Sequence, residues 1–340
     1  MNSQRQPPVY RSRLLQPASE RKPETHPLTW RLRDDGRVVD LRDYQSKDGY
    51  RSVRQVLNEH DPRAVIAAMK EANVRGRGGA GFSAGLKWSL TMQGGDMPRG
   101  YIVCNADEME PGTFKDRLLM EQQPHLLIEG MILAAFANNA RYGYIFLRGE
   151  YVESARVLTQ AISEAREAGW LGPDIAGSGF DFDIAVHTGA GRYICGEETA
   201  LLNSLEGKRA NPRAKPPFPG QSGAWGKPTV VNNVETLCNA PAVMLHGADW
   251  YQELSGDRTD DGGTKLYGAS GLVNRPGSGS YRSASPAGKS WTVPVACGTT
   301  GDSRPGCPAV PAPVFCCQST WICRWISIPW ARKAAAWARG

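Results

Sequence analysis

Apolar runs alternate with long helical segments through the middle of the chain, and this order limits the fold more than any other feature. Short apolar runs typical of buried strands lie at 100–108, 142–151 and 180–191. Segments of helical periodicity, at 114–140 and 153–169, separate them. Strands that alternate with helices of this length form parallel sheets with helices packed on their faces. The sequence therefore predicts an α/β fold, a doubly wound parallel sheet.

The two ends of the chain differ from this middle part. Residues 1–22 are polar and rich in Pro and Arg, so we expect them to be disordered. Residues 278–340 show neither the period of two residues typical of strands nor the period of 3.6 typical of helices. They hold five of the ten tryptophans, mixed with Pro, Arg and Cys, so we expect an aberrant, disordered tail. A GC-rich gene read in the wrong frame gives such a composition, which predicts a frameshift near Gly277. The alternative is a genuine interaction tail rich in Cys and Trp.

Charge and hydropathy exclude two kinds of partner. Residues 278–340 carry seven basic residues and one acidic residue, which accounts for the whole formal charge of +6. The remaining chain is neutral, so we expect no nucleic-acid groove. The most apolar stretch, 125–140, contains Glu129 and is shorter than the roughly 20 residues that cross a bilayer. Since the N-terminus also lacks the apolar core of a secretory signal, we expect a cytoplasmic protein with no direct membrane insertion.

The stretch "VRGRGGAGF" at 74–82 contains the glycine spacing G-x-G-x-x-G. In a dinucleotide-binding unit this fingerprint follows a strand and opens a helix. Here it follows a helical segment, 61–73, with Asp61 as the expected N-cap, so the first turn of such a unit is not expected. Consecutive glycines still let backbone N–H groups approach a phosphate or an aromatic ring, and Arg77 and Lys87 would add positive charge. A flexible linker fits the composition equally well.

Polar side chains follow the first predicted strand. The stretch "CNADEMEPGTFKDR" brings one amide and three acids together in six residues: Asn105, Asp107, Glu108 and Glu110. Open α/β sheets bind ligands at the carboxyl ends of their strands, so this stretch is a candidate site. A solvated loop with an acidic N-cap is the plain alternative. The five histidines show no metal-ligand spacing, so we expect no metal site.

The segment 187–220 begins with a glycine-rich turn. It leads through Tyr193 and Cys195 into a predicted helix that begins near Glu197 and Glu198. Two glutamates in a first helical turn favour the positive end of the helix dipole, which explains them without a ligand.

Two polar stretches follow that helix. The first, "KRANPRAKPPFPG", is basic and rich in proline, and its Lys215 and Phe218 are suited to clamp an anionic, aromatic ligand. The second, "KPTVVNNVETL", ends an apolar run in Asn232 and Asn233, whose amides can bind hydroxyl or phosphate oxygens.

Four segments together resemble one family: "RGRGGAGFSAGLKW", "CNADEMEPGT", "GAGRYICGEETALLNSLEGKRANPRAKPPFP" and "KPTVVNNVETL". They are similar to the flavoprotein subunit that receives NADH in respiratory complex I, the F subunit in bacteria and the 51 kDa subunit in mitochondria. The resemblance covers residues 22–277. Flavoprotein subunits of NAD-linked hydrogenases and formate dehydrogenases share much of the pattern.

The resemblance implies FMN, bound at the carboxyl edge of a Rossmann-like sheet, and NADH as substrate. It implies no catalytic acid or base, since the cofactor carries the hydride chemistry. The residues implied to bind FMN are Gly76, Arg77, Gly78, Lys87, Asn105, Asp107, Glu108, Tyr193, Gly196, Glu197, Asn232 and Asn233. Those implied to line the NADH site are Phe82, Glu110, Glu198, Lys215 and Phe218.

The resemblance also implies an order of domains. A segment with the glycine-rich FMN loop (23–85) precedes the Rossmann-like FMN/NADH domain (86–253), and the start of a ubiquitin-like, β-grasp domain (254–277) follows. The family then has a helical domain whose C-x-x-C-x-x-C motif and a fourth cysteine bind a [4Fe-4S] cluster. The cysteines of the tail do not reproduce this spacing, so we assign no metal to this chain.

The implied function is that of an NADH dehydrogenase, an oxidoreductase of the translocase class. FMN would pass electrons through the iron–sulfur chain of complex I towards quinone. The implied partners are a thioredoxin-like [2Fe-2S] subunit and a large iron–sulfur subunit, on the cytoplasmic face of the bacterial inner membrane. The alternatives are a flavoprotein subunit of a soluble hydrogenase or formate dehydrogenase, or a non-catalytic truncated product.

Overall fold

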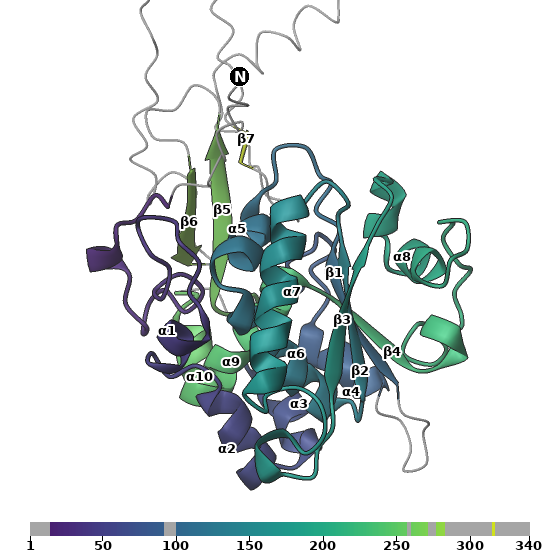
Figure 1. The fold of residues 1–340 in the computed structure, drawn as a ribbon, viewed down its shortest axis with the longest axis horizontal. Coiled ribbons are helices and arrows are strands. Elements are labelled where there is room, and N and C mark those ends of the chain that lie inside the picture. The colour runs from purple at the N-terminus through teal and green to yellow at the C-terminus, as the bar shows by residue number, and fades with distance from the viewer. Residues whose placement is uncertain (1–13, 92–99, 257–259, 271–276, 283–314, 317–340) are drawn as a thin grey trace, which may run out of the picture.

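A four-stranded parallel sheet lies at the centre of the molecule. The computed structural model describes residues 14–91, 100–256, 260–270, 277–282 and 315–316. The sheet has the strand order β3-β2-β1-β4 (Figure 1). Its strands are β1 (Tyr101–Ala106), β2 (Tyr142–Leu147), β3 (Asp183–Thr188) and β4 (Thr229–Asn233). Each of the three predicted strands contains one of the first three, and the apolar run in "KPTVVNNVETL" forms the fourth.

Neighbouring strands of this sheet end at the same level. Ala106 pairs with Leu147, and Leu147 pairs with Thr188. On the other side of β1, Asn105 pairs with Asn233. The carboxyl ends therefore form one edge of the sheet. The strand order reverses between β1 and β4, and open α/β sheets bind ligands at such a reversal.

Helices cover both faces of the sheet. Ile102 and Cys104 of β1 belong to the large core beneath four helices, whereas Val103 between them packs on the opposite face, as alternation along a strand requires. Leu201 and Leu202 of α8 (Glu198–Leu205) cover that opposite face. The four helices are α5 (Lys115–Gln122), α6 (Pro124–Ala137), α7 (Val152–Glu167) and α9 (Val234–His246). This arrangement confirms the predicted α/β, doubly wound fold.

One glycine allows α6 and α9 to pack closely. A Cβ atom at Gly130 of α6 would overlap the carbonyl oxygen of Leu237 in α9. Glycine in a helix interior costs stability relative to alanine, so its presence here reflects the close approach of the two backbones. All residues of α6 except Phe136 are buried, which explains why its sequence lacks an amphipathic pattern.

Among the described residues, four α-helices precede the sheet, and the glycine loop joins the last two. They are α1 (Leu41–Gln45), α2 (Arg51–Glu59), α3 (Pro62–Glu71) and α4 (Ala84–Thr91). The predicted N-cap of α3 is confirmed, since the Asp61 side chain accepts a hydrogen bond from Arg63 N at 2.8 Å. Val65, Ile66 and Met69 are buried on one side of this helix. The loop therefore follows a helix, as the sequence predicted.

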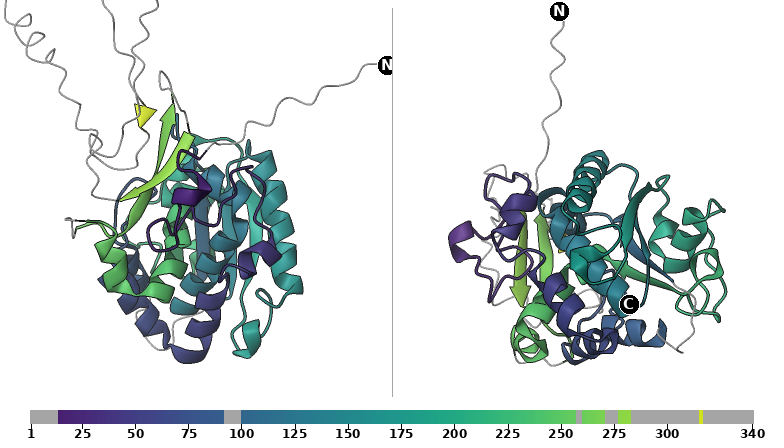
Figure 2. Two further views of the ribbon diagram at one scale, coloured as in Figure 1. Left: turned by 90° about the vertical axis from the view of Figure 1, so that its left-hand side faces the viewer. Right: turned by 60° about the horizontal axis from the view of Figure 1, so that its bottom comes forward.

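A second, antiparallel sheet lies beside the N-terminal segment, as the light green and purple ribbons in Figure 2 show. It has the order β6-β5-β7, and its strands are β5 (Thr264–Ser270), β6 (Gly277–Arg282) and β7 (Phe315–Cys316). Leu14 forms a bridge with Ser278, and the Gln16 amide donates to Ser280 O at 2.7 Å. That this sheet begins a β-grasp domain stays a prediction.

These contacts correct two predicted boundaries. Residues 14–22 were expected to be disordered, but they include the short helix η1 (Ala18–Glu20), and Arg21 is buried with its guanidinium on Thr29 O and Asp34. The predicted boundary after residue 277 falls inside β6, which continues to Arg282. Leu14 and Gln16 bond to the backbone of β6, so each of these two segments is held by a partner more than 260 residues away. Local composition does not reveal such long-range pairing. Residues 1–13 and most of the tail lie outside the described residues.

The remaining short elements connect these parts. They are η2 (Ile175–Gly177), η3 (Tyr193–Gly196), η4 (Ala224–Gly226) and α10 (Ala248–Glu253). Within the described part of the chain, no helix combines the length and the hydropathy needed to cross a membrane.

The charged residue that interrupts the apolar stretch has a structural role. Glu129 of α6 is buried and accepts hydrogen bonds from the hydroxyls of Tyr44 and Ser52, the latter at 2.5 Å. Because buried charges are costly unless fully hydrogen-bonded, these two donors make the carboxylate tolerable inside the core. Glu129 thereby ties α6 to α1 and α2.

Replacing Gly130 by alanine is expected to lower the free energy of unfolding by about 1–3 kcal/mol, because the added methyl group would force α6 and α9 apart. Urea denaturation of the purified protein measures this change. Gln160→Ala, at an exposed position of α7, is the matched control and should change stability by less than about 0.5 kcal/mol. Equal stability of the Gly130 variant and the wild type would contradict the close packing described here.

Candidate functional site

The carboxyl edge of the sheet brings the loops after β1 and β3 together. The Asn105 amide donates to Gly196 O at 2.9 Å, and the Tyr193 hydroxyl donates to Glu110 at 2.5 Å. A Cβ atom at Gly196 would lie 4.0 Å from Asp107 O. Two of the predicted segments therefore meet at this edge, although they are about ninety residues apart in the sequence.

The glycine loop meets the end of β4. A Cβ atom at Gly78 would lie only 3.1 Å from the Cβ atom of Asn233, so a larger residue there would crowd Asn233. The backbone N–H of Gly76 donates to Phe82 O at 2.9 Å, which closes the loop on itself. The Trp88 indole of α4 donates to the Asn232 side chain at 2.8 Å. These contacts place the loop against the same strand ends.

A cluster of two lysines and two glutamates lies at the N-terminus of α8. Lys87 Nζ lies 3.0 Å from Glu198 and donates to Val231 O at 3.1 Å. Lys215 Nζ lies 2.7 Å from Glu198 and 3.3 Å from Glu197. Burial opposes the ionisation of Glu198, but the two lysines outweigh it and lower the pKa of its carboxyl group. Glu198 is therefore held as a carboxylate whose charge is largely matched.

Glu197 also forms hydrogen bonds with the backbone of α8. Its carboxylate accepts hydrogen bonds from the backbone N–H groups of Thr199 and Ala200, both at 2.8 Å. This is an N-cap, so the sequence interpretation that these glutamates favour the helix terminus describes Glu197 correctly.

Asp107 and Glu108 are carboxyl groups with raised pKa values. Burial raises the pKa of Asp107 to about 6, and its Oδ2 is a buried atom without a hydrogen-bond partner among the described residues. Burial, together with the nearby charge of Asp116, raises the pKa of Glu108 to about 7. Glu108 also accepts hydrogen bonds from two backbone N–H groups at the start of α5 and from the Tyr151 hydroxyl. Asp107 thus offers a free acceptor at the edge of the sheet.

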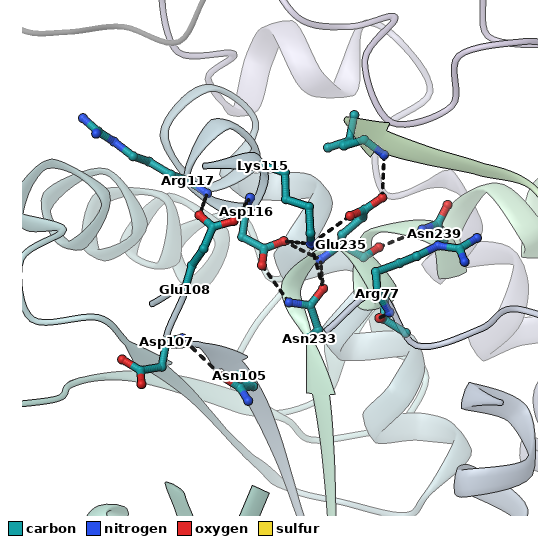
Figure 3. Close-up of polar contacts among 12 residues, drawn as sticks. Arg77, Asn105, Asp107, Glu108, Lys115, Asp116, Arg117, Asn233, Glu235 and Asn239 are labelled. Atoms are coloured by element: carbon teal, nitrogen blue, oxygen red, sulfur yellow. Dashed lines mark hydrogen bonds and ion pairs between the residues drawn. The ribbon is translucent and has the colours of Figure 1, made fainter. Parts of the chain in front are cut away.

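Arg77 differs from the sequence expectation. Its guanidinium is buried and donates to Asp261 at 2.6 Å and to Gly262 O at 2.8 Å. In Figure 3 the guanidinium points away from Asp107. Its backbone N–H donates to Thr236 at 2.8 Å. The side chain therefore anchors the loop before β5 and does not bring its charge to the strand ends. The direction of the Arg77 side chain depends on Asp261, about 180 residues away, and nothing in the local sequence indicates this contact.

Three aromatic rings predicted to lie at the site are exposed. The exposed fractions are 45% for Phe82, 55% for Phe218 and 64% for Tyr193. Exposed rings of this size are available to stack on a planar ligand. Within the described residues, no hydrogen bond or ring contact joins Phe218 to the other predicted residues, so its place in a ligand site stays a prediction.

Sequence reasoning missed a buried ionic cluster beside the site. Lys115 and Asp116 open α5, and Glu235 lies in the first turn of α9; all three are buried (Figure 3). Lys115 Nζ lies 2.8 Å from a carboxylate oxygen of each acid. Adjacent charges at the start of a helix usually face solvent, so only the tertiary structure distinguishes them.

Cavities in the described part of the chain lie away from this edge, and one of ≈ 300 Å³ is near Arg54, Trp170 and Ala176. A cavity of ≈ 170 Å³ lies near Trp30, Arg51 and His246, and no predicted site residue lines it. Among the residues that the structure describes, no group of His, Cys, Asp and Glu is arranged to hold a metal ion.

Residues 69–242 match the Nuo51 FMN-binding domain. The F subunit of NADH-quinone oxidoreductase in Escherichia coli (strain K12) is 64% identical over 257 residues, which cover 76% of this chain and 57% of that protein. Its counterpart in Aquifex aeolicus is 50% identical over 241 residues, which cover 71% and 55%.

A solved structure gives a more distant likeness. A chain of the NAD+-reducing [NiFe]-hydrogenase in its air-oxidised state superposes with a TM-score of 0.58 at 44% identity, over 65% of this chain and 36% of that chain. This chain spans about 57% of the length of its relatives in Escherichia coli and Salmonella typhimurium.

The raised pKa of Asp107 predicts a pH dependence of stability. Since the folded-state pKa of about 6 lies above the ordinary value of 3.8, the folded protein binds this proton more tightly than the unfolded chain. Its contribution to stability is therefore fully present below about pH 4 and is lost as the pH rises through about 6. Asp107→Asn removes this titration, so between pH 4 and 7 the wild type should lose about 1 kcal/mol more stability than the variant.

Urea denaturation of the cofactor-free proteins at both pH values measures the difference. Asp249→Asn, at an exposed position of α10, is the control and should keep the pH dependence of the wild type. Parallel pH profiles for the wild type and the Asp107 variant would contradict the burial argument.

Proposed function

The chain belongs to the family of the Nuo51 FMN-binding domain, and from this premise we propose that it binds FMN and accepts a hydride from NADH. We place it in an NADH:quinone oxidoreductase as the flavoprotein subunit. The observation that carries this proposal is the meeting of four distant segments at the carboxyl edge of one sheet, where the strand order reverses. The identity of 64% with the relative in Escherichia coli, against 44% with the hydrogenase chain, favours this function over that of a hydrogenase flavoprotein.

The residues at this edge fit FMN. The glycines of the loop leave room where a phosphate or a flat ring would approach, and Lys87 in α4, the helix after the loop, carries a positive charge. The buried Oδ2 of Asp107 is a free acceptor for the N–H or hydroxyl donors that a flavin and its ribityl chain carry. The remaining residues proposed to hold FMN are Gly76, Gly78, Asn105, Glu108, Tyr193, Gly196, Glu197, Asn232 and Asn233, with Arg77 contributing indirectly by anchoring the loop.

The protein's part in the proposed reaction is to hold FMN and the nicotinamide nucleotide and to orient them. Bound FMN supplies the two-electron acceptor for a hydride from the nicotinamide. Phe82 and Phe218 would limit the approach of the nicotinamide nucleotide and exclude water from it. Glu110 and the pair Glu198–Lys215 would line the nucleotide site. No side chain needs to exchange a proton with the substrate, because a hydride carries both electrons.

Electron flow beyond the flavin needs partners. We propose that the full assembly includes a thioredoxin-like [2Fe-2S] subunit and a large iron–sulfur subunit, at the cytoplasmic face of a bacterial inner membrane. We assign no [4Fe-4S] cluster to this chain because its cysteines lack the C-x-x-C-x-x-C motif. The rival proposal is a non-catalytic chain that binds flavin but transfers no electrons.

A reduction experiment distinguishes the two proposals. The purified chain is loaded with FMN, freed of excess cofactor and mixed with NADH without oxygen. Loss of the visible flavin absorption is expected, and electron transfer to an artificial acceptor should follow. A bound flavin that keeps its absorption in NADH but loses it with dithionite would support the non-catalytic product.

Glu198 is expected to disfavour NADPH. Its carboxylate would repel the additional phosphate, and it also holds Lys87 and Lys215, which would otherwise attract that phosphate. Glu198→Gln should therefore lower the ratio of kcat/KM for NADH over NADPH by about tenfold. Flavin reduction rates with each nucleotide measure this ratio. Glu253→Gln, at the exposed end of α10, is the control and should leave the ratio unchanged. An unchanged ratio for the Glu198 variant would show that another residue sets the specificity.

A further inference from the structure

Asp116 joins the ends of β1 and β4 at the edge of the sheet (Figure 3). Its Oδ2 accepts a hydrogen bond from the Asn233 amide at 2.6 Å, and its backbone N–H donates to Glu108 at 3.0 Å. Glu108 follows β1, and Asn233 ends β4. Only 3% of Asp116 is exposed, so this bridge is shielded from water. One residue therefore fixes two side chains from neighbouring strands.

The hydrogen bonds of the Asn233 side chain leave one of its N–H donors available for a ligand. Its Oδ1 accepts from the backbone N–H of Glu235 at 3.0 Å and from Lys115 at 3.4 Å. Its Nδ2 gives one N–H to Asp116. An asparagine amide has two N–H donors and two acceptor lone pairs, so both lone pairs and one donor are used. The second N–H of Asn233 is the group left for a ligand, and its direction is set by Asp116.

The charges beneath this amide depend on one another. Burial opposes the charge on Lys115, but the carboxylates of Asp116 and Glu235 outweigh it and raise the pKa of the ammonium group above its usual value. Glu235 also accepts from Leu266 N in β5 at 2.8 Å. Removing one member of a buried ionic cluster leaves the others uncompensated. The cluster can therefore hold Asn233 in one orientation only while it is complete.

We propose that Asp116 and Lys115 are positioning residues of the cofactor site, which set the affinity for FMN by fixing the Asn233 amide and the Glu108 carboxyl group. This inference rests on the proposed function, since it takes FMN as the ligand. Neither residue needs to touch the flavin. A merely structural clamp would instead act on the stability of the fold and leave the affinity for FMN unchanged.

The test compares two buried carboxylates. Asp116→Asn keeps the shape of the side chain but faces the Asn233 N–H with an amide, so the dissociation constant for FMN should rise about tenfold to a hundredfold. Glu129→Gln is the matched control, because Glu129 is also buried and doubly hydrogen-bonded but lies between α6, α1 and α2. This control should lose stability and bind FMN within about twofold of the wild type. Quenching of FMN fluorescence measures binding, and thermal unfolding without FMN measures stability.

A double-mutant cycle shows whether Asp116 acts through Asn233. On an Asn233→Ala background, Asp116→Asn should weaken FMN binding by less than about twofold further, since the group that it orients is gone. Full additivity of the two changes would overturn the proposal, as would wild-type FMN affinity in the Asp116 variant. Equal losses of affinity in the Asp116 and Glu129 variants would also overturn it.

A second variant covers the case in which Asp116→Asn does not fold. The exchange Asp116→Asn with Asn233→Asp restores the hydrogen bond with the donor and acceptor reversed and keeps the total charge. It should recover the unfolding temperature but bind FMN about tenfold or more weakly than the wild type, because the free N–H is lost. Wild-type affinity in this exchange would overturn the proposal. A wild-type chain that binds no FMN at all would instead refute the proposed function.

Discussion

The level ends of β1 and β4 are the constraint on which the rest of the site depends. Asn105 and Asn233 are register partners, so the side chains that follow the two strands emerge side by side. Residues of α4, η3 and α5 then form hydrogen bonds with these strand ends, such as the bond from the Trp88 indole to the Asn232 side chain. A shift of one residue in this register would turn the same side chains to the opposite faces of the sheet.

Burial at this edge gives its charges different roles. Lys87 and Lys215 neutralise the glutamates at the start of α8, where a nucleotide would lie, so this entrance carries little net charge. Beneath the strand ends, Lys115 is enclosed by carboxylates and holds the scaffold in place. Asp107 follows β1 and keeps a buried oxygen without a hydrogen-bond partner among the described residues. Under the proposed function, this edge would separate the groups that bind ligand from the groups that hold the scaffold, as suits a protein whose cofactor performs the reaction.

Much of this could be read from the sequence, because it depends on local patterns. The alternation of strands and helices predicted the sheet, Asp61 predicted the start of α3, and the polar residues after the strands predicted the edge at which the candidate residues meet. What could not be read depends on distant partners. Arg77 looked like a ligand for an anion but bonds to Asp261, and Glu129 looked like an interruption but ties three helices together. Residues 14–22 looked disordered by composition but pack beside β6, whose pairing no local pattern encodes.

The most direct test of the account is a crystal structure of this chain with FMN. We expect the flavin at the carboxyl edge of the sheet, against the glycine loop, with Asp107 Oδ2 and the free N–H of Asn233 as hydrogen-bond partners. A flavin bound instead in the cavity near Trp30 and His246, or at another surface away from the strand ends, would contradict the central claim that the four segments form one cofactor site.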